Sequence, residues 1–85
     1  MATPQEKEYQ ELVESFGGKA VGLTFNPSNL LAVQVIKTDC AELINELDQS
    51  RKDTEDGDVK RMLSVAITHI QEAQMWAVKA VTWSK

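Results

Sequence analysis

The last long segment of this 85-residue sequence, residues 59–83, constrains the fold most, because a helix over it would be apolar on almost every side. One set of its residues recurs every three or four positions and predicts a close, alanine-rich helix–helix seam. This set comprises Val59, Leu63, Ala66, Ile70, Ala73, Ala77 and Ala80. The second set comprises Met62, Val65, Ile67, Met75, Trp76, Val78, Val81 and Trp83. Since one long and one short partner helix cannot cover both sets, the segment predicts a homo-oligomer with this helix at its centre.

Upstream of this segment, the pattern predicts a short first helix over about residues 4–16. Thr3-Pro4-Gln5-Glu6 resembles a capping box with proline at the first helical position. Gly17-Gly18 is expected to end the helix, because glycine accepts the left-handed conformation of a C-terminal cap. An apolar stripe follows the helical period, through Tyr9, Leu12, Val13 and Phe16.

A second helix is expected over about residues 28–49, after a partly extended connector over 19–28, with Asn26 or Ser28 as its N-cap. Its predicted seam comprises Val33, Ile36, Cys40, Leu43 and Leu47. The acidic stretch 48–58 suits a turn into the third helix, expected over about 58–83 and capped by Asp53, Thr54 or Asp58. At ~1.5 Å per residue the two long helices would measure ~33 and ~37 Å, a good match for an antiparallel hairpin. We therefore expect an all-α fold in a single domain, residues 1–85: a short N-terminal helix plus a long antiparallel two-helix hairpin, assembling into a compact homo-oligomer.

The charge distribution narrows the classes of partner. Nine Lys and Arg against 13 Asp and Glu give a net charge of −4, which argues against binding a nucleic-acid polymer through its phosphates. The final segment, 59–85, is basic, however, with four lysines and arginines against Glu72, and this allows a small anionic ligand. One cysteine excludes an internal disulfide, and neither a membrane span nor a signal peptide is evident, so we expect a reduced, cytoplasmic protein.

Catalytic and metal-binding patterns are weak, so we expect no enzyme activity, no cofactor and no metal. His69 lacks a partner at a spacing that suggests a triad, and Cys40 falls on an apolar stripe. The acidic run 53–58 fails as a calcium loop, because placing Gly57 at the sixth position puts Lys52 at the first ligand. Gly17-Gly18-Lys19 lacks the remaining residues of a phosphate loop.

A binding constellation remains around the start of the second helix. Phe25 precedes the helix start at Asn26-Pro27-Ser28, where free backbone amides attract phosphate. Lys37 follows 12 residues after Phe25. An aromatic ring that stacks on a base and an ammonium that meets a phosphate are the elements of a nucleotide site. The alternative is that Phe25 is a core residue, and that Trp76 and Trp83 are interface core.

Several short stretches of the sequence resemble those of the phage anti-CBASS cyclic-oligonucleotide sponge family. The resemblance covers roughly residues 21–83 and is most specific in the final helix. It rests on Gly22-Leu23-Thr24-Phe25-Asn26-Pro27-Ser28, Val35-Ile36-Lys37, Ala41-Glu42-Leu43-Ile44, Arg61-Met62-Leu63, Ala66-Ile67-Thr68, Gln71-Glu72-Ala73-Gln74-Met75-Trp76-Ala77-Val78-Lys79-Ala80 and Thr82-Trp83.

The resemblance implies a helical hairpin that assembles into a hexamer and sequesters cyclic dinucleotides, and in several members cyclic trinucleotides, without cleaving them. Such a protein acts in the cytoplasm of the infected bacterial host, where it removes the messengers of CBASS immunity. By position, Phe25 corresponds to the base-stacking aromatic and Lys37 to the phosphate-binding lysine, in pockets shared between protomers. Lys79, or less closely Arg61, corresponds to the basic residue of the trinucleotide pockets.

Two other functions stay open from the sequence. A helical interaction module could block a host protein through a face formed by Met75, Trp76 and Trp83. A cyclic-nucleotide hydrolase ranks third, because the sequence offers neither a metal cluster nor an activated nucleophile.

Overall fold

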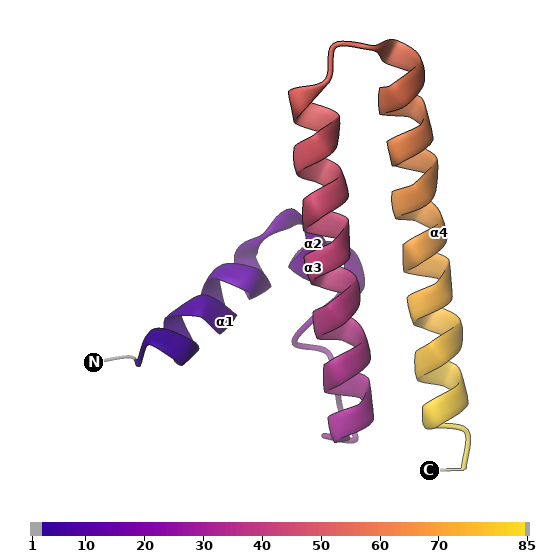
Figure 1. Cartoon of the computed structure of the whole chain (residues 1–85). Coiled ribbons are helices and arrows are strands. Elements are labelled where there is room, and N and C mark those ends of the chain that lie inside the picture. Colours follow the sequence, from indigo (N-terminus) through magenta and orange to yellow (C-terminus); the bar gives the residue numbers. More distant parts are fainter. Residues whose placement is uncertain (1–2, 85) are drawn as a thin grey trace.

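The computed structural model describes residues 3–84, which form four helices and no strand. The helices are α1 (Pro4–Glu14), α2 (Phe16–Val21), α3 (Leu31–Asp53) and α4 (Gly57–Val81). α3 and α4 run antiparallel and are joined by a short turn (Figure 1). The predicted all-α class with a long helical hairpin is therefore confirmed.

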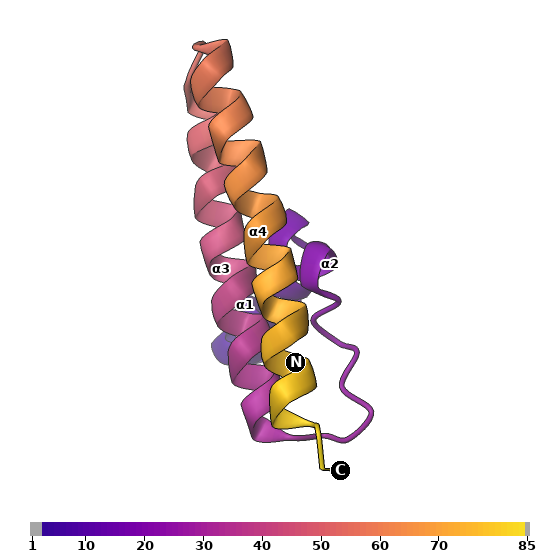
Figure 2. The same ribbon diagram turned by 90° about the vertical axis from the view of Figure 1, so that its right-hand side faces the viewer.

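The two short helices differ in how they pack against the hairpin. α2 and the connector that follows it lie against one face of α3 and α4, whereas α1 projects sideways (Figures 1 and 2). The described part of the chain is consequently flat, with extents of 43 × 37 × 13 Å. The buried core lies where α2, α3 and α4 meet and comprises Val21, Leu23, Ala41, Ile44 and Ile67.

The predicted end of the first helix at Gly17-Gly18 is wrong, because these glycines lie inside α2. The break is at Ser15, whose extended backbone ends α1 and whose Oγ accepts a hydrogen bond from the amide of Gly18 (3.1 Å). A Cβ on Gly17 would overlap the carbonyl oxygen of Ala41, so glycine is required here for the backbones of α2 and α3 to touch. Asn45 of α3 holds the junction, since its Oδ1 accepts from the Gly17 amide (2.7 Å) and its Nδ2 donates to Ser15 Oγ (2.8 Å).

The second helix begins at Leu31 instead of the predicted residue 28, and it ends at Asp53 instead of residue 49. Neither Asn26 nor Ser28 caps α3, because the N-cap position is Leu30, which has no side-chain capping bond. Asn26 instead bonds both backbone groups of Leu30, at 3.0 Å through Nδ2 and 3.3 Å through Oδ1, and so closes the preceding loop.

The third helix spans Gly57–Val81 rather than 58–83, and its cap differs from the three candidates. Asp56 occupies the N-cap position, and its Oδ1 accepts from the amides of Asp58 (2.9 Å) and Val59 (3.4 Å). A carboxylate at this position is favoured by the positive end of the helix dipole.

The buried row of α3 is offset from the predicted seam and includes two charged residues. It comprises Val33, Lys37, Ala41, Ile44 and Asp48. Apolar periodicity could not predict Lys37 and Asp48, because a charged group is buried only where specific partners compensate it. Asp48 meets Arg51 (2.6 Å) and Lys52 (3.1 Å), and the Arg51 hydrogen bond lowers the pKa of this carboxyl.

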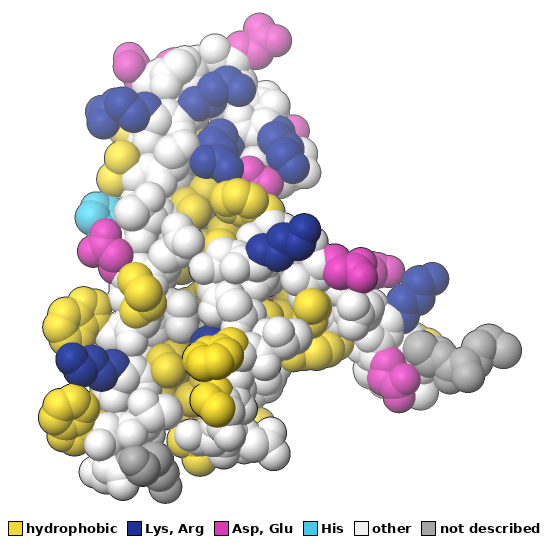
Figure 3. All heavy atoms as spheres, turned by 180° about the vertical axis from the view of Figure 1, so that it is seen from behind, with side chains coloured by type: hydrophobic (Ala, Val, Ile, Leu, Met, Phe, Trp, Pro, Cys, Tyr) yellow, Lys and Arg dark blue, Asp and Glu magenta, His cyan; other side chains and the backbone are white. Residues whose placement is uncertain are grey.

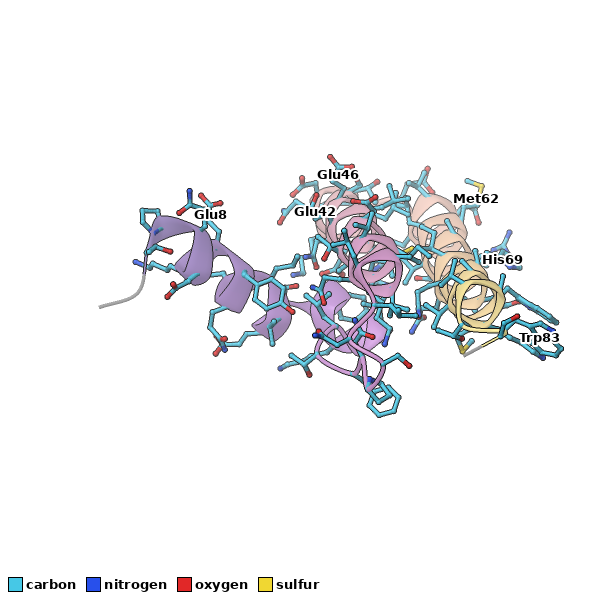
Figure 4. The ribbon with its side chains drawn as sticks, turned by 90° about the horizontal axis from the view of Figure 1, so that it is seen from below. Glu8, Glu42, Glu46, Met62, His69 and Trp83 are labelled. Carbon is cyan, nitrogen blue, oxygen red and sulfur yellow. The ribbon has the colours of Figure 1, made fainter. Side chains whose placement is uncertain are left out.

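Helix α4 carries more apolar side chains than the rest of the described protomer covers, as the sequence predicts. Of the second set, Ile67 is buried and Val78 is half-buried, and the other six side chains are exposed: Met62, Val65, Met75, Trp76, Val81 and Trp83. Met62, His69 and Trp83 point away from α3, on the outer side of α4 (Figure 4). Among the described residues, no helix is sufficiently long and hydrophobic to cross a bilayer.

Candidate functional site

A pocket of about 220 Å³ lies where the connector, α3 and the end of α4 meet. The connector contributes four consecutive residues to its wall, α3 contributes two, and α4 contributes Val78 together with Thr82, the residue that caps its C-terminal end. The lining residues are Phe25, Asn26, Pro27, Ser28, Val33, Lys37, Val78 and Thr82. Four of the six sequence-predicted binding residues therefore share one cavity: Phe25, Asn26, Ser28 and Lys37.

Lys37 is the single charged residue among those that line the pocket. Its side chain is buried, with the residue 5% exposed, and its Nζ donates hydrogen bonds to the carbonyl oxygens of Gly22 (3.1 Å) and Phe25. An ammonium has three N–H donors, so one remains for another acceptor. Burial lowers the pKa of Lys37. A neighbouring anion would stabilise the charged form, because carbonyl dipoles compensate a buried charge only in part.

Phe25 stands over this ammonium at the edge of the pocket. Lys37 Nζ lies 5.4 Å from the centre of the Phe25 ring, within the range of a cation–π interaction. Phe25 is 71% exposed. The alternative interpretation, in which Phe25 is a core residue of the protomer, is therefore wrong. A ring that is open to solvent and fixed beside a cation offers a surface on which a planar base can stack.

The backbone that carries Phe25 is held by two residues with positive φ. Gly22 ends α2 at φ 60°, and Asn29 adopts φ 50° just before α3. Glycine and asparagine accept this left-handed region at the lowest cost, which lets the connector turn twice within a few residues. The loop is therefore shaped by its own backbone and by the Asn26 side chain.

Lys79 and Arg61 lie outside the pocket. Lys79 is on the outer face of α4, where its Nζ lies 5.3 Å from the Trp76 ring and 5.6 Å from the Trp83 ring. Arg61 is 18 positions earlier on the same helix, about 27 Å away at ~1.5 Å per residue. One protomer thus presents the predicted basic residues at three separate places: Lys37 in the pocket, Lys79 between two indoles, and Arg61 near the hairpin turn.

The sequence pattern missed the contribution of the end of α4 to the pocket. In the sequence Val78 belongs to the surplus apolar set, and Thr82 belongs only to the family resemblance, without a predicted role in the site. The Thr82 Oγ1 donates to the carbonyl oxygen of Val78 (2.7 Å), so its lone pairs point elsewhere and can accept a further hydrogen bond. Because α3 and α4 are antiparallel, the end of α4 lies beside the start of α3, and only the pairing of the helices brings Thr82 to Lys37.

The pocket is small for the ligand class it suggests. Sites that enclose a drug-sized molecule usually measure ~300–1,000 Å³. A cavity of about 220 Å³ can hold one phosphate or part of a base, but it cannot enclose a whole cyclic dinucleotide. A complete site would therefore need a second wall.

The fold and the pocket define a class of protein, namely a helical hairpin that holds a buried cation and an exposed aromatic ring at one end. The family model described as "Acb2/Tad1, hairpin domain" matches residues 18–82. The chain belongs to this family, which is the anti-CBASS sponge family that the sequence resembles and which is associated with the sequestration of cyclic nucleotides. No curated protein and no solved structure matches the chain significantly. The matched range includes α3, α4 and the pocket, whereas α1 lies outside it.

Proposed function

We propose that this protein binds cyclic dinucleotides at the Lys37 pocket and sequesters them intact, thereby withdrawing the signals of CBASS immunity in the cytoplasm of the infected bacterial host. The observation that carries the proposal is the buried ammonium of Lys37, which has an unused donor in a cavity that contains no other charge among its lining residues. A phosphate would supply the missing counter-charge, and hydrogen bonds between charged groups are the stronger ones.

In this proposal the Phe25 ring receives one base of the ligand. The ring faces solvent next to the ammonium, so a base stacked on it would place the attached phosphate towards the pocket. Asn26 and Ser28, on the same wall, can hydrogen-bond the sugar or base. Stacking on an aromatic side chain contributes ~1–3 kcal/mol per base and tolerates different bases, which suits a protein that removes more than one signal.

The second wall of the site would come from another protomer of a homo-oligomer, which we propose is a hexamer. A two-fold interface repeats the same patch on both subunits, so two Lys37 side chains would face the two phosphates of a cyclic dinucleotide. The exposed apolar side chains of α4 support assembly, because large apolar patches on a small chain mark interaction surfaces.

Cyclic trinucleotides are the second proposed ligand class. Lys79 is the proposed basic residue of a separate site, with Arg61 as the other candidate. Support comes from the position of Lys79 at the surface, where an ammonium between two indole rings combines a phosphate ligand with stacking surfaces.

We further propose that the bound ligand is not cleaved. Hydrolysis of a phosphodiester needs a base or metal-bound water beside the phosphorus. The side chains that line the pocket supply an ammonium, an amide and hydroxyls, and they include no carboxylate, imidazole or thiol.

Calorimetry with a cyclic dinucleotide tests the proposal, followed by heat denaturation of the complex and chromatography of the released ligand. Tight binding and recovery of the intact ring are expected. Absence of binding would contradict the ligand class, and a linear product would contradict sequestration. Lys37→Met removes the ammonium while keeping a long side chain, and Lys79→Met is its matched control on the outer face.

A helical module that blocks a host protein is the alternative function. The observation that favours it is the exposure of Met75, Trp76 and Trp83, which are 59%, 69% and 74% exposed. It predicts that Lys37→Ala preserves anti-defence activity while Trp76→Ala abolishes it. The sponge proposal predicts the opposite order for cyclic dinucleotide signals.

A further inference from the structure

The half of α4 next to the hairpin turn presents a basic and apolar surface that no other element of the described chain covers. Arg61 is exposed there and makes no ion pair within the described residues, and Met62 and Val65 are exposed beside it. Lys and Arg side chains lie at this end of the molecule, interspersed with the Asp and Glu side chains of the hairpin turn (Figure 3). Two copies of this surface placed face to face would oppose like charges, so it calls for an acidic partner.

A groove of about 440 Å³ between α1 and α3 has the opposite character. Glu8, Glu11 and Glu42 line it together with Tyr9 and Leu12, and its lining includes no basic residue. Its full lining is Gln5, Glu8, Tyr9, Glu11, Leu12, Ser15, Thr38, Glu42 and Asn45. Glu8 of α1 and Glu42 and Glu46 of α3 extend to the same side of the molecule (Figure 4). The groove is thus both acidic and partly apolar.

The groove has a defined shape although α1 contains no buried residue. At the Ser15 junction, α1 is anchored by Asn45, which accepts a hydrogen bond from the Gly17 amide and donates one to Ser15 Oγ. Nearer its middle, the Tyr9 hydroxyl accepts a hydrogen bond from Gln34 Nε2 of α3 (3.1 Å). These contacts hold α1 at a distance from α3 that leaves the apolar stripe of α1 incompletely covered, with Tyr9 exposed.

We propose that the hairpin-turn half of α4, with Arg61, Met62 and Val65, docks in the α1–α3 groove of a second copy of this chain. Arg61 would meet the carboxylates of Glu8, Glu11 and Glu42, since guanidinium groups pair with carboxylates in bidentate geometry. Met62 and Val65 would cover the apolar side chains of Tyr9 and Leu12. The two surfaces carry opposite charges and both include apolar side chains, whereas either surface placed against a copy of itself would oppose like charges.

Such a contact joins two different surfaces, so it is heterologous and propagates from copy to copy until a ring closes. The inference rests on the assembly that forms part of the proposed function, but not on ligand binding. It gives α1, which lies outside the family match, a role in assembly. It also leaves the Lys37 pocket at the other end of α4 free to be completed by a different interface.

Charge reversal tests the contact, with multi-angle light scattering at low ionic strength as the measurement. The wild-type chain is expected at a multiple of 9.5 kDa. Glu42→Arg and Arg61→Glu should each lower the mass to a smaller multiple. The double variant Glu42→Arg/Arg61→Glu, and an equimolar mixture of the two single variants, should regain the wild-type mass because opposite charges again face one another. Glu14→Arg makes the same charge change on α1 outside the groove and should leave the mass unchanged.

Circular dichroism of each variant checks that the helices remain, and Arg61→Gln provides a milder substitution if Arg61→Glu unfolds the chain. A wild-type monomer, single variants that keep the full mass, or a double variant that stays dissociated would each overturn the contact. Calorimetry on the reassembled double variant separates the two proposals. Lack of cyclic dinucleotide binding in a correctly assembled protein would contradict the proposed function and leave the interface standing.

Discussion

Lys37 and Lys79 both lie close to aromatic rings, yet the chain places them in opposite surroundings. Lys37 is 5.4 Å from one ring, is 5% exposed and donates to two backbone carbonyls. Lys79 is exposed and lies 5.3 and 5.6 Å from two indole rings. The same pair of residue types thus forms an enclosed, oriented site in one place and an open surface in the other.

The difference arises from the connector after α2. Residues 22–30 pass over the start of α3 and supply both the carbonyls that hold Lys37 and the ring above it. Lys79, on the far side of α4, has no such covering segment among the described residues. A cation whose position is fixed before the ligand arrives binds without a large ordering cost, which favours the enclosed site.

The largest expected effect comes from Gly17→Ala, which disturbs the contact between α2 and α3 that positions the connector. The added Cβ would overlap the Ala41 carbonyl oxygen, so α2 would be forced away from α3, and overpacking of this kind costs about 3 kcal/mol. Urea denaturation should show this loss of stability. Gly57→Ala is the matched control, because a Cβ there meets no atom within 4 Å. Equal stability of the two variants would contradict the described seating of α2.

Lys37→Met should lower the affinity for a cyclic dinucleotide by about 100-fold, since a hydrogen bond to a charged group contributes ~1.5–3 kcal/mol and the pocket has no second cation among its lining residues. Calorimetry measures the change. Lys79→Met, at the open site, should change the same affinity by less than about threefold. If both substitutions lower the affinity equally, the enclosure of Lys37 does not determine where the cyclic dinucleotide binds.

Phe25→Ala should weaken cyclic dinucleotide binding by about tenfold through the loss of stacking. Because the residue is 71% exposed, the free energy of unfolding should change by less than about 0.5 kcal/mol. Phe25→Trp should preserve binding, because the larger indole ring keeps an aromatic stacking surface. A Phe25→Ala variant that loses stability but binds normally would assign the ring to packing instead.

The smallest effect concerns pH, and its sign follows from the lowered pKa of Lys37. In the alkaline window between this folded pKa and the ordinary value of 10.5, the unfolded chain binds the proton that the folded chain has released. The free energy of unfolding therefore gains a contribution as pH rises through this window. Affinity for a phosphate changes the other way, because it requires the charged ammonium.

Thermal denaturation across this pH range should show the contribution in the wild type and in Lys79→Met, and should lack it in Lys37→Met. Titrations over the same range should show weaker binding at higher pH. Affinity that is constant across the window would separate Lys37 from the phosphate.

Local patterns in the sequence were sufficient to predict the hairpin and to single out connector residues and Lys37, which the structure places around one cavity. Helical periodicity over about 22 and 25 residues predicts two long helices, and a turn between them makes them antiparallel. The break at Ser15 was not predictable in the same way, because it depends on Asn45, 30 positions later in the chain. Gly17 likewise has the pattern of a helix stop signal, and only its contact with the backbone of α3 reveals why glycine is needed there.

The sequence by itself determined that the chain is a helical hairpin with more apolar surface on its last helix than one protomer can cover. Both properties follow from the order of residues along a helix and need no long-range contact. Only the tertiary structure decided which face of α3 is buried, that Lys37 is held beneath Phe25, and that Thr82 joins them at the pocket. The physical reason is that a buried charge is tolerable only beside particular carbonyls, and these come from a connector whose course is set by the contact of α2 with α3.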